Sequence, residues 1–572
     1  MDYSYIDAVE AGEVINVWMR DNSGMMIEEQ YPLSDYLYAY VKDNTGKPDM
    51  LDIYGNPMKK VCFADKWDFR KWKEGVDGLC ESDIAPVYKM LPDRFKDAPR
   101  DAPVNVMFYD IEVDFDLDDG DGYPTPKNPF GEINSFQAFD TYLNRYVFIL
   151  NEKFENKVVL KDDTHPIDIY YVRNERELIK TISMVIDHVD IMTAWFGAGF
   201  DLPYIMERAI YHFGEKEAKT MFCRDGFSAK RREFVNDFGE EVWEWTLVGR
   251  HHLDMMVLYK KFIPGEKQSF SLDSVCEADL GETKDAYDGD LGSLYRENPQ
   301  AFFNYALQDA RLLKKLDDKH QIIKLAITMA RMNCVKFGDV TGSVKPIESG
   351  ILIFAHERGV VLPDKKDNEK EKFPGAIVYD TIAGRHEWVF TIDLNSLYPS
   401  VMRMLGLSPE TLIMQLLGEY EDYIKVMTKQ KVPVTVYLER EQEEIEIMAD
   451  ELESVIRENG YCIAGSGAIF DGRMGLLAEY VQDLVFSRKK YQKMMKEAAS
   501  NGDEKLSETY DLYQKVMKLF ANSVFGSCGE KSFRLYDLRL SKAITLTARV
   551  VSKWQAWKSN DAVNKLKEGH NL

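Results

Sequence analysis

Asp393-Leu394-Asn395-Ser396-Leu397-Tyr398-Pro399-Ser400 is the most informative stretch of this sequence. The run before it, Trp388 to Ile392, is apolar and rich in β-forming residues, and it predicts a buried strand. Pro399 removes a backbone donor, so the strand cannot continue through it. Asp393 is therefore expected at the strand end, where its carboxylate is available to a metal ion. Because a single aspartate after an apolar run is more often a turn residue, the rest of the chain must supply further evidence.

Composition indicates a soluble, globular, multidomain protein. The 572 residues suggest about four domains, and 45% of them are hydrophobic while 29% are charged. No apolar run approaches the roughly 18 residues of a membrane span, and the N-terminus has no basic region followed by an apolar core. The seven cysteines are scattered without a close pair, which suits reduced thiols and argues against a zinc module. We therefore expect a cytoplasmic protein with no membrane partner.

The formal net charge of -24 is unfavourable for a nucleic-acid partner, since phosphates are neutralised by Lys and Arg. Net charge is only a sum, however, and acidic surfaces can coexist with a local basic track. A case for DNA binding must therefore rest on particular stretches.

A second group of carboxylates lies upstream. The β-rich run Val104 to Tyr109 leads into Asp110-Ile111-Glu112, and residues two apart in a strand face the same side, about 7 Å apart. Asp201 follows a glycine-containing turn that enters a helix. Tyr305 and Asp309 are four residues apart in a segment with helical spacing, so they share a face. Carboxylates arranged in this way can hold two Mg²⁺ or Mn²⁺ ions for phosphodiester cleavage.

These motifs together resemble those of family B DNA polymerases, most closely the T-even-type bacteriophage group. The octet at Asp393 resembles motif A, and the upstream set resembles the DEDD-type 3′–5′ proofreading exonuclease of the family. The resemblance implies metal binding and catalysis by Asp110, Glu112, Asp201 and Asp309, with Tyr305 orienting the attacking water. The family often has Asn where this sequence has Phe196, which weakens the inferred DNA contact there.

For motif A the resemblance implies that Asp393 is catalytic and binds metal together with the Leu394 carbonyl. Tyr398 would pack under the sugar of the incoming dNTP. The expected nucleotide-contacting residues of this motif are Leu394, Ser396, Leu397 and Tyr398.

Two helices are expected to form the polymerase fingers as a compact hairpin. The first spans Leu476 to Lys496, and the second contains Lys518-Leu519-Phe520-Ala521-Asn522-Ser523-Val524-Phe525-Gly526, which resembles motif B with Phe525 in place of Tyr. Lys518 and Asn522 share a helix face, and a cation there suits a triphosphate. The substrate-binding residues implied on this helix are Lys518, Asn522, Phe525 and Gly526.

The basic residues on the first helix can be aligned in two ways. Without a gap the family's Arg and Lys fall at Lys489 and Lys493, and with a shift of one they fall at Arg488 and Gln492. We favour Lys489 and Lys493, with Arg488 nearby.

Three further segments have two interpretations each. The segment from Arg232 to Val248 predicts a hairpin, which either separates primer from template or is purely structural. Residues Leu438 to Ile456 predict an acidic amphipathic helix, either solvated or docking a partner. The turn at Gly375 either approaches the template backbone or is a generic turn.

The predicted fold class is α/β multidomain: an RNase H-like exonuclease, an N-terminal domain, a partial palm and helical-hairpin fingers. The expected boundaries are 1–103 for the N-terminal domain, with 340–380 returning to it, and 104–339 for the exonuclease. The palm is expected at 381–468 with motif A, the fingers at 469–530, and a palm helix at 531–572.

The sequence contains no motif C, of the Tyr-Gly-Asp-Thr-Asp-Ser kind, and no thumb. Asp393 with one carbonyl is a poor site for two Mg²⁺ ions. We therefore expect either a truncation or, preferably, the N-terminal subunit of a split phage DNA polymerase whose second polypeptide carries motif C and the thumb. Its other partners would be a DNA primer-template and, through the second polypeptide, a sliding clamp and single-strand-binding protein. The rival predictions are a stand-alone 3′–5′ exonuclease and a non-catalytic DNA-binding or assembly subunit.

Overall fold

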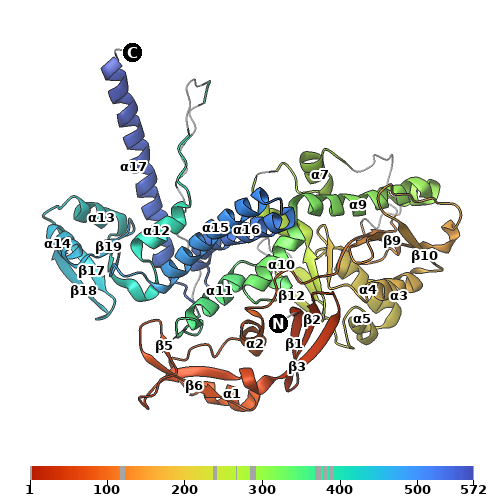
Figure 1. Ribbon diagram of the computed structural model, residues 1–572, viewed down its shortest axis with the longest axis horizontal. Coiled ribbons are helices and arrows are strands. Elements are labelled where there is room, and N and C mark those ends of the chain that lie inside the picture. Colours follow the sequence, from red (N-terminus) through yellow and green to blue (C-terminus); the bar gives the residue numbers. More distant parts are fainter. Residues whose placement is uncertain are drawn as a thin grey trace. The chain divides into compact units, whose positions relative to one another are not determined.

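A computed structural model describes residues 3–115, 123–235, 241–265, 267–283, 291–367, 375, 377, 380, 383–385 and 391–570 of the chain (Figure 1). The chain divides into two compact units, one of residues 1–36 and 86–342 and the other of residues 37–85 and 343–572. Each unit contains both helices and sheets, as the predicted α/β class requires. Within the described residues, no helix is long and apolar enough to cross a bilayer.

The first unit begins with a three-stranded antiparallel sheet of β1 (Tyr3–Ala11), β2 (Val14–Asp21) and β3 (Met26–Pro32). Helix α2 (Pro86–Phe95) packs beside it, and the Tyr5 ring lies 5.3 Å from that of Phe95. The Tyr5 hydroxyl donates to the carbonyl oxygens of Ala330 and Val335, at 3.0 and 2.6 Å. These contacts attach the N-terminal strands to the helical end of the same unit.

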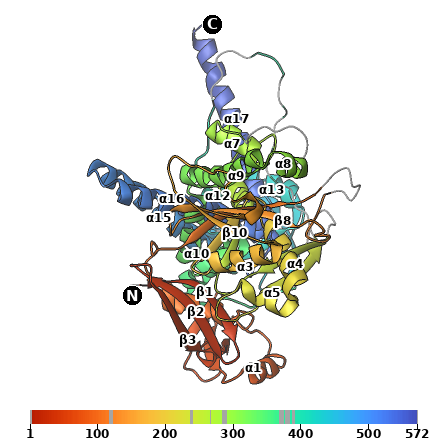
Figure 2. The same cartoon turned by 90° about the vertical axis from the view of Figure 1, so that its right-hand side faces the viewer.

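A six-stranded sheet forms the centre of the first unit, in the order β10-β9-β8-β7-β11-β14. Its strands are β7 (Val106–Val113), β8 (Ile133–Asp140), β9 (Arg145–Asn151), β10 (Ile167–Val172), β11 (Ile191–Ala194) and β14 (His251–Asp254). Strand β7 is antiparallel to β8 and parallel to β11. Helices α3 (Glu175–Val185) and α4 (Asp201–Phe213) cover one face and α9 (Pro299–His320) covers the other (Figures 1 and 2). The predicted strand that carries Asp110 and Glu112 is therefore a central, buried strand.

The remaining elements of this unit surround the sheet. They are α5 (Glu215–Met221), α6 (Met255–Phe262), α7 (Leu272–Leu280), α8 (Leu291–Glu297) and α10 (Ile322–Met332). The predicted hairpin is confirmed as β12 (Lys230–Val235) paired antiparallel with β13 (Glu241–Thr246), while its turn, residues 236–240, lies outside the described residues.

The second unit contains two sheets. One has the order β15-β5-β6-β4 and joins β15 (Val360–Val361) to β5 (Met50–Asp52), β6 (Pro57–Cys62) and β4 (Tyr38–Lys42). The other has the order β18-β17-β16-β20-β19 and comprises β16 (Leu412–Leu416), β17 (Pro433–Leu438), β18 (Glu443–Met448), β19 (Cys462–Ile463) and β20 (Ala468–Phe470). Residues 360–361, far along the chain, thus pair with a strand near residue 50.

The helices of the second unit include the expected hairpin, α15 (Leu476–Ser500) and α16 (Glu504–Cys528), joined by three residues. The others are α1 (Lys66–Lys73), α11 (Val344–His356), α12 (Leu397–Leu405), α13 (Glu419–Met427), α14 (Ala449–Asn459) and α17 (Leu538–His570). The prediction of a compact helical hairpin is confirmed.

The predicted domain boundaries concern smaller divisions than these two units, and they stay predictions.

The prediction of one helix over residues 438–456 is wrong in its first half. Residues 443–448 form strand β18, and the helix begins only at Ala449. Ile445 and Ile447 alternate with glutamates and pack against the buried cluster of this sheet. This period-two pattern is typical of a half-buried strand, and it outweighs the coarser spacing that suggested a helix.

The predicted strand before Asp393 is also wrong where it can be examined. Trp388, Val389 and Phe390 lie outside the described residues. Thr391 and Ile392 belong to an irregular segment, and Ile392 is 52% exposed. A strand needs a neighbour to take its backbone hydrogen bonds, and no described strand pairs with this segment.

Candidate active site

Strand β7 and helix α9 bring three of the predicted carboxylates together. Asp110 and Glu112 alternate along β7, and Asp309 projects from α9 on the face of the sheet that this helix covers. One carboxylate oxygen from each of the three residues lies within 4.8 Å of the other two. Glu112 and Asp309 are buried, whereas Asp110 is partly exposed. The cluster is therefore mostly shielded from water but open at Asp110.

Asp201, the fourth predicted carboxylate, is the first residue of α4 and is buried. It accepts a hydrogen bond from the backbone N–H of Ile111, at 3.3 Å, which places it beside β7 at the residue between Asp110 and Glu112. Burial of the side chain, and then the nearby Asp110 carboxylate, hold the pKa of Asp201 well above its usual value. A bound cation would offset both effects.

The Asp110 carboxylate is oriented by a residue that the sequence analysis missed. Gln137 lies opposite Asp110 on β8, is fully buried, and donates from Nε2 to Asp110 Oδ2 at 2.7 Å. The Ser135 hydroxyl in turn donates to Gln137 Oε1 at 3.0 Å. Hydrogen bonds of this kind fix the orientation of a metal-binding carboxylate.

Asp254 is a second residue that was missed. It ends β14 and caps α6 by accepting from the Val257 N–H at 3.1 Å, and it also accepts from the Ala198 N–H at 3.1 Å. Its charge contributes to the raised pKa of Asp201. Asp254 thus anchors the turn that precedes Asp201. Its place between an apolar strand and a helix is a capping signal that the sequence does show.

Tyr305 lies one helical turn before Asp309 on α9 and is buried, so the predicted shared face is confirmed. Its role in orienting water stays a prediction.

The motif A residues lie in the second unit. Asp393 is exposed, and α12 begins at Leu397 after Ser396, whose φ of 53° is in the left-handed region. The Tyr398 ring lies 4.4 Å from that of Phe525 on α16, centroid to centroid. The structure therefore brings motif A and motif B into contact. Within the described residues, the cluster of carboxylates suited to a metal ion does not include Asp393.

The fingers leave both alignments of the basic residues open. Lys518 and Asn522 are exposed on α16, and Gln514 precedes them by one turn on the same face. Arg488 Nε and Gln492 Nε2 both lie 3.4 Å from Gln514 Oε1 and donate to it.

Lys489 and Lys493 are exposed on α15 and follow Phe486 at helical spacing. The Arg403 guanidinium of α12 lies 5.5 Å from the Phe486 ring, so this face of α15 begins beside the motif A helix. The position beside the motif A helix favours Lys489 and Lys493 as the residues that contact the dNTP. The contact with Gln514, which lies on the face of Lys518 and Asn522, favours Arg488 instead.

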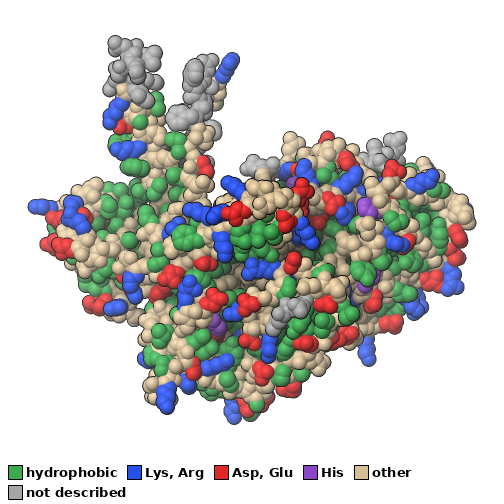
Figure 3. All heavy atoms as spheres, in the orientation of Figure 1, with side chains coloured by type: hydrophobic (Ala, Val, Ile, Leu, Met, Phe, Trp, Pro, Cys, Tyr) green, Lys and Arg blue, Asp and Glu red, His purple; other side chains and the backbone are tan. Residues whose placement is uncertain are grey.

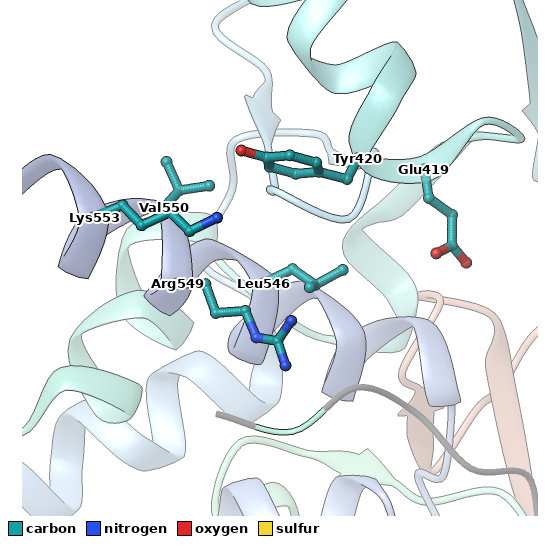
Figure 4. Close-up of a pocket in the computed structure, with 6 residues that line it drawn as sticks. All are labelled: Glu419, Tyr420, Leu546, Arg549, Val550 and Lys553. Atoms are coloured by element: carbon teal, nitrogen blue, oxygen red, sulfur yellow. The ribbon is translucent and has the colours of Figure 1, made fainter. Parts of the chain in front are cut away.

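A cavity of about 230 Å³ lies between α13 and α17, and the six lining residues labelled in Figure 4 are not among the predicted site residues. Figure 4 shows the Tyr420 ring on one side of it and the cationic chains of Arg549 and Lys553 on the other. The Arg549 Nε donates to the Gly375 carbonyl oxygen at 2.8 Å, and the predicted template contact of Gly375 stays a prediction.

The surface charge is mixed on the face that Figure 3 draws, where acidic and basic side chains alternate with hydrophobic ones. The net charge of -24 therefore does not take the form of a uniformly acidic face in this view.

Comparison with protein families identifies two matching segments. Residues 340–565 match the family DNA polymerase family B, and residues 79–275 match DNA polymerase family B, exonuclease domain. The chain belongs to DNA polymerase family B. The six-stranded sheet and its helices are accordingly the RNase H-like exonuclease domain of this family B chain, and the second unit contains its palm elements.

Among its family B relatives, the DNA-directed DNA polymerase of Escherichia phage RB69 is 26% identical over 98% of this chain and 67% of its own length. That of Enterobacteria phage T4 is 26% identical over 90% of this chain and 62% of its own length. The DNA polymerase delta catalytic subunit of Schizosaccharomyces pombe is 25% identical over 69% of this chain and 34% of its own length. The chain thus spans about two thirds of the length of the phage relatives.

Proposed function

We propose that this family B chain is a metal-dependent 3′–5′ exonuclease that proofreads DNA primer ends, and that it also supplies one half of a polymerase site. The observation that carries the exonuclease proposal is the convergence of Asp110, Glu112 and Asp309 within 4.8 Å. Asp201 stands beside them with a pKa that burial and Asp110 hold well above the usual range.

The residues fit Mg²⁺ or Mn²⁺, because the four donors are carboxylates and these hard cations prefer oxygen ligands. When bound, two such ions would polarise the phosphodiester and lower the pKa of an attacking water. Gln137 holds the Asp110 carboxylate in place, Tyr305 orients the water, and the buried sides of the cluster exclude bulk solvent.

The exonuclease proposal is tested by the degradation of 3′-labelled single-stranded DNA with Mg²⁺. Asp309→Asn should abolish degradation. Asp318→Asn, on the exposed face of the same helix, is the matched control and should retain it. Equal activity of wild type and Asp309→Asn would contradict the proposal.

The polymerase half rests on the contact between Tyr398 and Phe525, which joins motif A to motif B. We propose that Leu394, Ser396, Leu397 and Tyr398 contact the dNTP from motif A, and that Lys518, Asn522, Phe525 and Gly526 contact it from the fingers. Asp393 and the Leu394 carbonyl would hold a metal ion in this half. The complementary carboxylates of motif C, and the thumb, would come from a second polypeptide, as would contacts to a sliding clamp or single-strand-binding protein.

The rival function is a stand-alone exonuclease, and the placement of all four carboxylates in one compact unit favours it. A primer-extension assay distinguishes the two proposals. The chain alone should degrade a primer without extending it. Addition of a polypeptide carrying motif C and the thumb should restore extension, and Asp393→Asn should remove it. Extension by the isolated chain would contradict the divided site, and no extension in the presence of the second polypeptide would favour the stand-alone exonuclease.

A further inference from the structure

The turn between β11 and α4 holds an aromatic residue in an unusual way. Phe196 has a φ of 60°, in the left-handed region, and its side chain is 52% exposed. Bulky residues rarely adopt this conformation, and such strain gathers at functional sites. A single exposed aromatic side chain needs no explanation, but one held by a strained backbone beside a carboxylate cluster does.

Hydrogen bonds fix the backbone of this turn. The Phe196 carbonyl oxygen accepts from the N–H groups of Gly199 and Phe200, at 3.0 and 3.1 Å. The N–H of Ala198 donates to Asp254 Oδ2 at 3.1 Å. The turn is thus tied at one side to Asp254 and at the other to the start of α4, where Asp201 begins the helix.

Two glycines leave the space that the turn requires. A Cβ on Gly199 would lie 2.4 Å from the Cζ of Phe196 and 2.7 Å from both of its Cε atoms, so the ring rests directly on the Gly199 backbone. A Cβ on Gly197 would lie 2.5 Å from the Ala194 Cβ and 2.9 Å from His252 Nε2. The turn is therefore packed tightly on the side of Ala194 and His252, while one part of the Phe196 ring stays open to solvent.

The turn that carries this ring leads directly into Asp201, since the Phe196 carbonyl oxygen accepts from the N–H of Phe200, the residue before Asp201. Asp254, which holds this turn, is close enough to Asp201 to contribute to its raised pKa. A flat apolar ring held on the turn before Asp201 can stack on a nucleotide base, an interaction that tolerates every base because each has a π-face.

We propose that Phe196 stacks on the terminal base of single-stranded DNA and positions the 3′ end over the carboxylates. This inference rests on the proposed exonuclease function. Phe196 acts as a positioning residue, and it takes no part in proton transfer or metal binding.

Metal-free binding tests the proposal without turnover. Fluorescein-labelled oligothymidylate is titrated in EDTA, and Phe196→Ala is expected to weaken binding about tenfold, the equivalent of about 1.4 kcal/mol of lost stacking. Phe196→Trp should bind at least as tightly as wild type, because it keeps a stacking ring. Gly199→Ala should weaken binding like Phe196→Ala, because the added methyl displaces the ring.

A strand whose 3′-terminal nucleotide is abasic isolates the stacking contact. Wild type should bind it as weakly as Phe196→Ala binds the normal strand, and Phe196→Ala should lose nothing further. Tyr211→Ala is the matched control, since Tyr211 is 74% exposed on α4 of the same unit, and its affinity for both strands should equal that of wild type. An equal loss of affinity by Phe196→Ala on both strands, or no loss on either, would overturn the proposal.

Kinetics with Mg²⁺ separate this proposal from the exonuclease assignment. Phe196→Ala should raise KM for single strands about tenfold with kcat little changed. If wild type degrades DNA and Phe196→Ala has unchanged KM and affinity, the stacking role is wrong while the exonuclease assignment stands. If wild type degrades no DNA, the proposed function fails, and the positioning role at a reacting 3′ end fails with it.

Discussion

Gln137 is the residue whose contribution to the carboxylate site can be measured most directly. Its fully buried side chain donates from Nε2 to Asp110 Oδ2 at 2.7 Å. Gln137→Leu should therefore leave Asp110 poorly oriented and raise the Mg²⁺ concentration for half-maximal exonuclease activity about tenfold or more. The rate measured as a function of Mg²⁺ checks this.

Gln300→Leu is a suitable control, because Gln300 lies on α9 but bonds to Val159 instead of a site carboxylate. The same Mg²⁺ dependence for Gln137→Leu and wild type would show that Asp110 needs no such support.

Asp317 makes stability depend on pH. Burial raises its pKa from 3.8 to about 6, although its Oδ1 accepts from the Ile323 N–H at 2.9 Å. Because the folded pKa is raised, the contribution to stability is fully present below about pH 3.8 and is lost as pH rises through about 6. Asp317→Asn stays neutral and keeps the acceptor, so it should stabilise the protein at pH 8 by about 1–2 kcal/mol and change it little at pH 4.

Thermal unfolding at the two pH values checks the Asp317 prediction, with Asp163→Asn, at an exposed aspartate of the same unit, as control. An equal gain at pH 4 and pH 8 would show that the effect does not come from ionisation.

The sequence predicted some site residues and missed others for a clear physical reason. The shared face of Asp110 and Glu112 follows from strand alternation, and that of Tyr305 and Asp309 from helical spacing, which are both local patterns. Their assignment to a metal site rested on the resemblance to family B exonucleases. Gln137 reaches Asp110 through the pairing of β7 with β8, and this register depends on residues far from either position. The exposure of the Phe196 ring was missed as well, because it depends on how the ring packs against the Gly199 backbone in three dimensions.

Among the elements, strand β18 shows where a local pattern was read at the wrong period. Glu443 to Met448 contains Ile445 and Ile447 in alternation, and both pack on the sheet core. The helical prediction was correct only from Ala449, because there the apolar residues Leu452 and Ile456 recur every four positions and are buried. The strand predicted before Asp393 is wrong for a different reason. No described strand is available to pair with Thr391 and Ile392.

The finger helices yield a prediction that decides between the two alignments. Lys489 and Lys493 are exposed on the α15 face that begins beside α12, while Arg488 bonds to Gln514. Lys489→Ala and Lys493→Ala should each weaken dNTP binding about tenfold, as should Lys518→Ala, because each removes a charge-assisted contact to phosphate. Arg488→Ala should change it less than threefold.

Equilibrium dialysis of a dNTP with Mg²⁺ measures these affinities, and Lys490→Ala is the control on the same helix. A large loss for Arg488→Ala together with no loss for Lys489→Ala would select the shifted alignment.

At the scale of the whole molecule, each of the two compact units is built from two separate stretches of the chain. Residues 1–36 belong with the exonuclease unit, whereas residues 37–85 belong with the palm elements. The pairing of β15 with β5 shows why, since a strand near residue 360 completes a sheet begun near residue 50. The expected return of residues 340–380 to the N-terminal domain is a connection of this kind, and the finer domain boundaries stay predictions.

The net charge of -24 also acts at this scale, and it opposes the approach of DNA. At about 0.01 M salt the Debye length is about 30 Å, so an approaching strand interacts with the charge of much of the protein. At about 0.1 M it falls to about 10 Å, and only nearby side chains are felt. Salt above that weakens the local contacts of Lys and Arg with phosphate through counterion release.

We therefore expect the affinity for single-stranded DNA to pass through a maximum near 0.1 M salt, instead of falling steadily as it does for a basic protein. Fluorescence anisotropy in EDTA from 0.01 to 0.5 M NaCl measures this, and association rates should rise over the first tenfold increase in salt because the repulsion is screened. The Phe196→Ala variant should show the same maximum at lower affinity, since stacking carries no charge. A linear fall of log affinity with log salt over the whole range would mean that the strand meets a local basic track shielded from the remaining charge, and that the net charge has no part in binding.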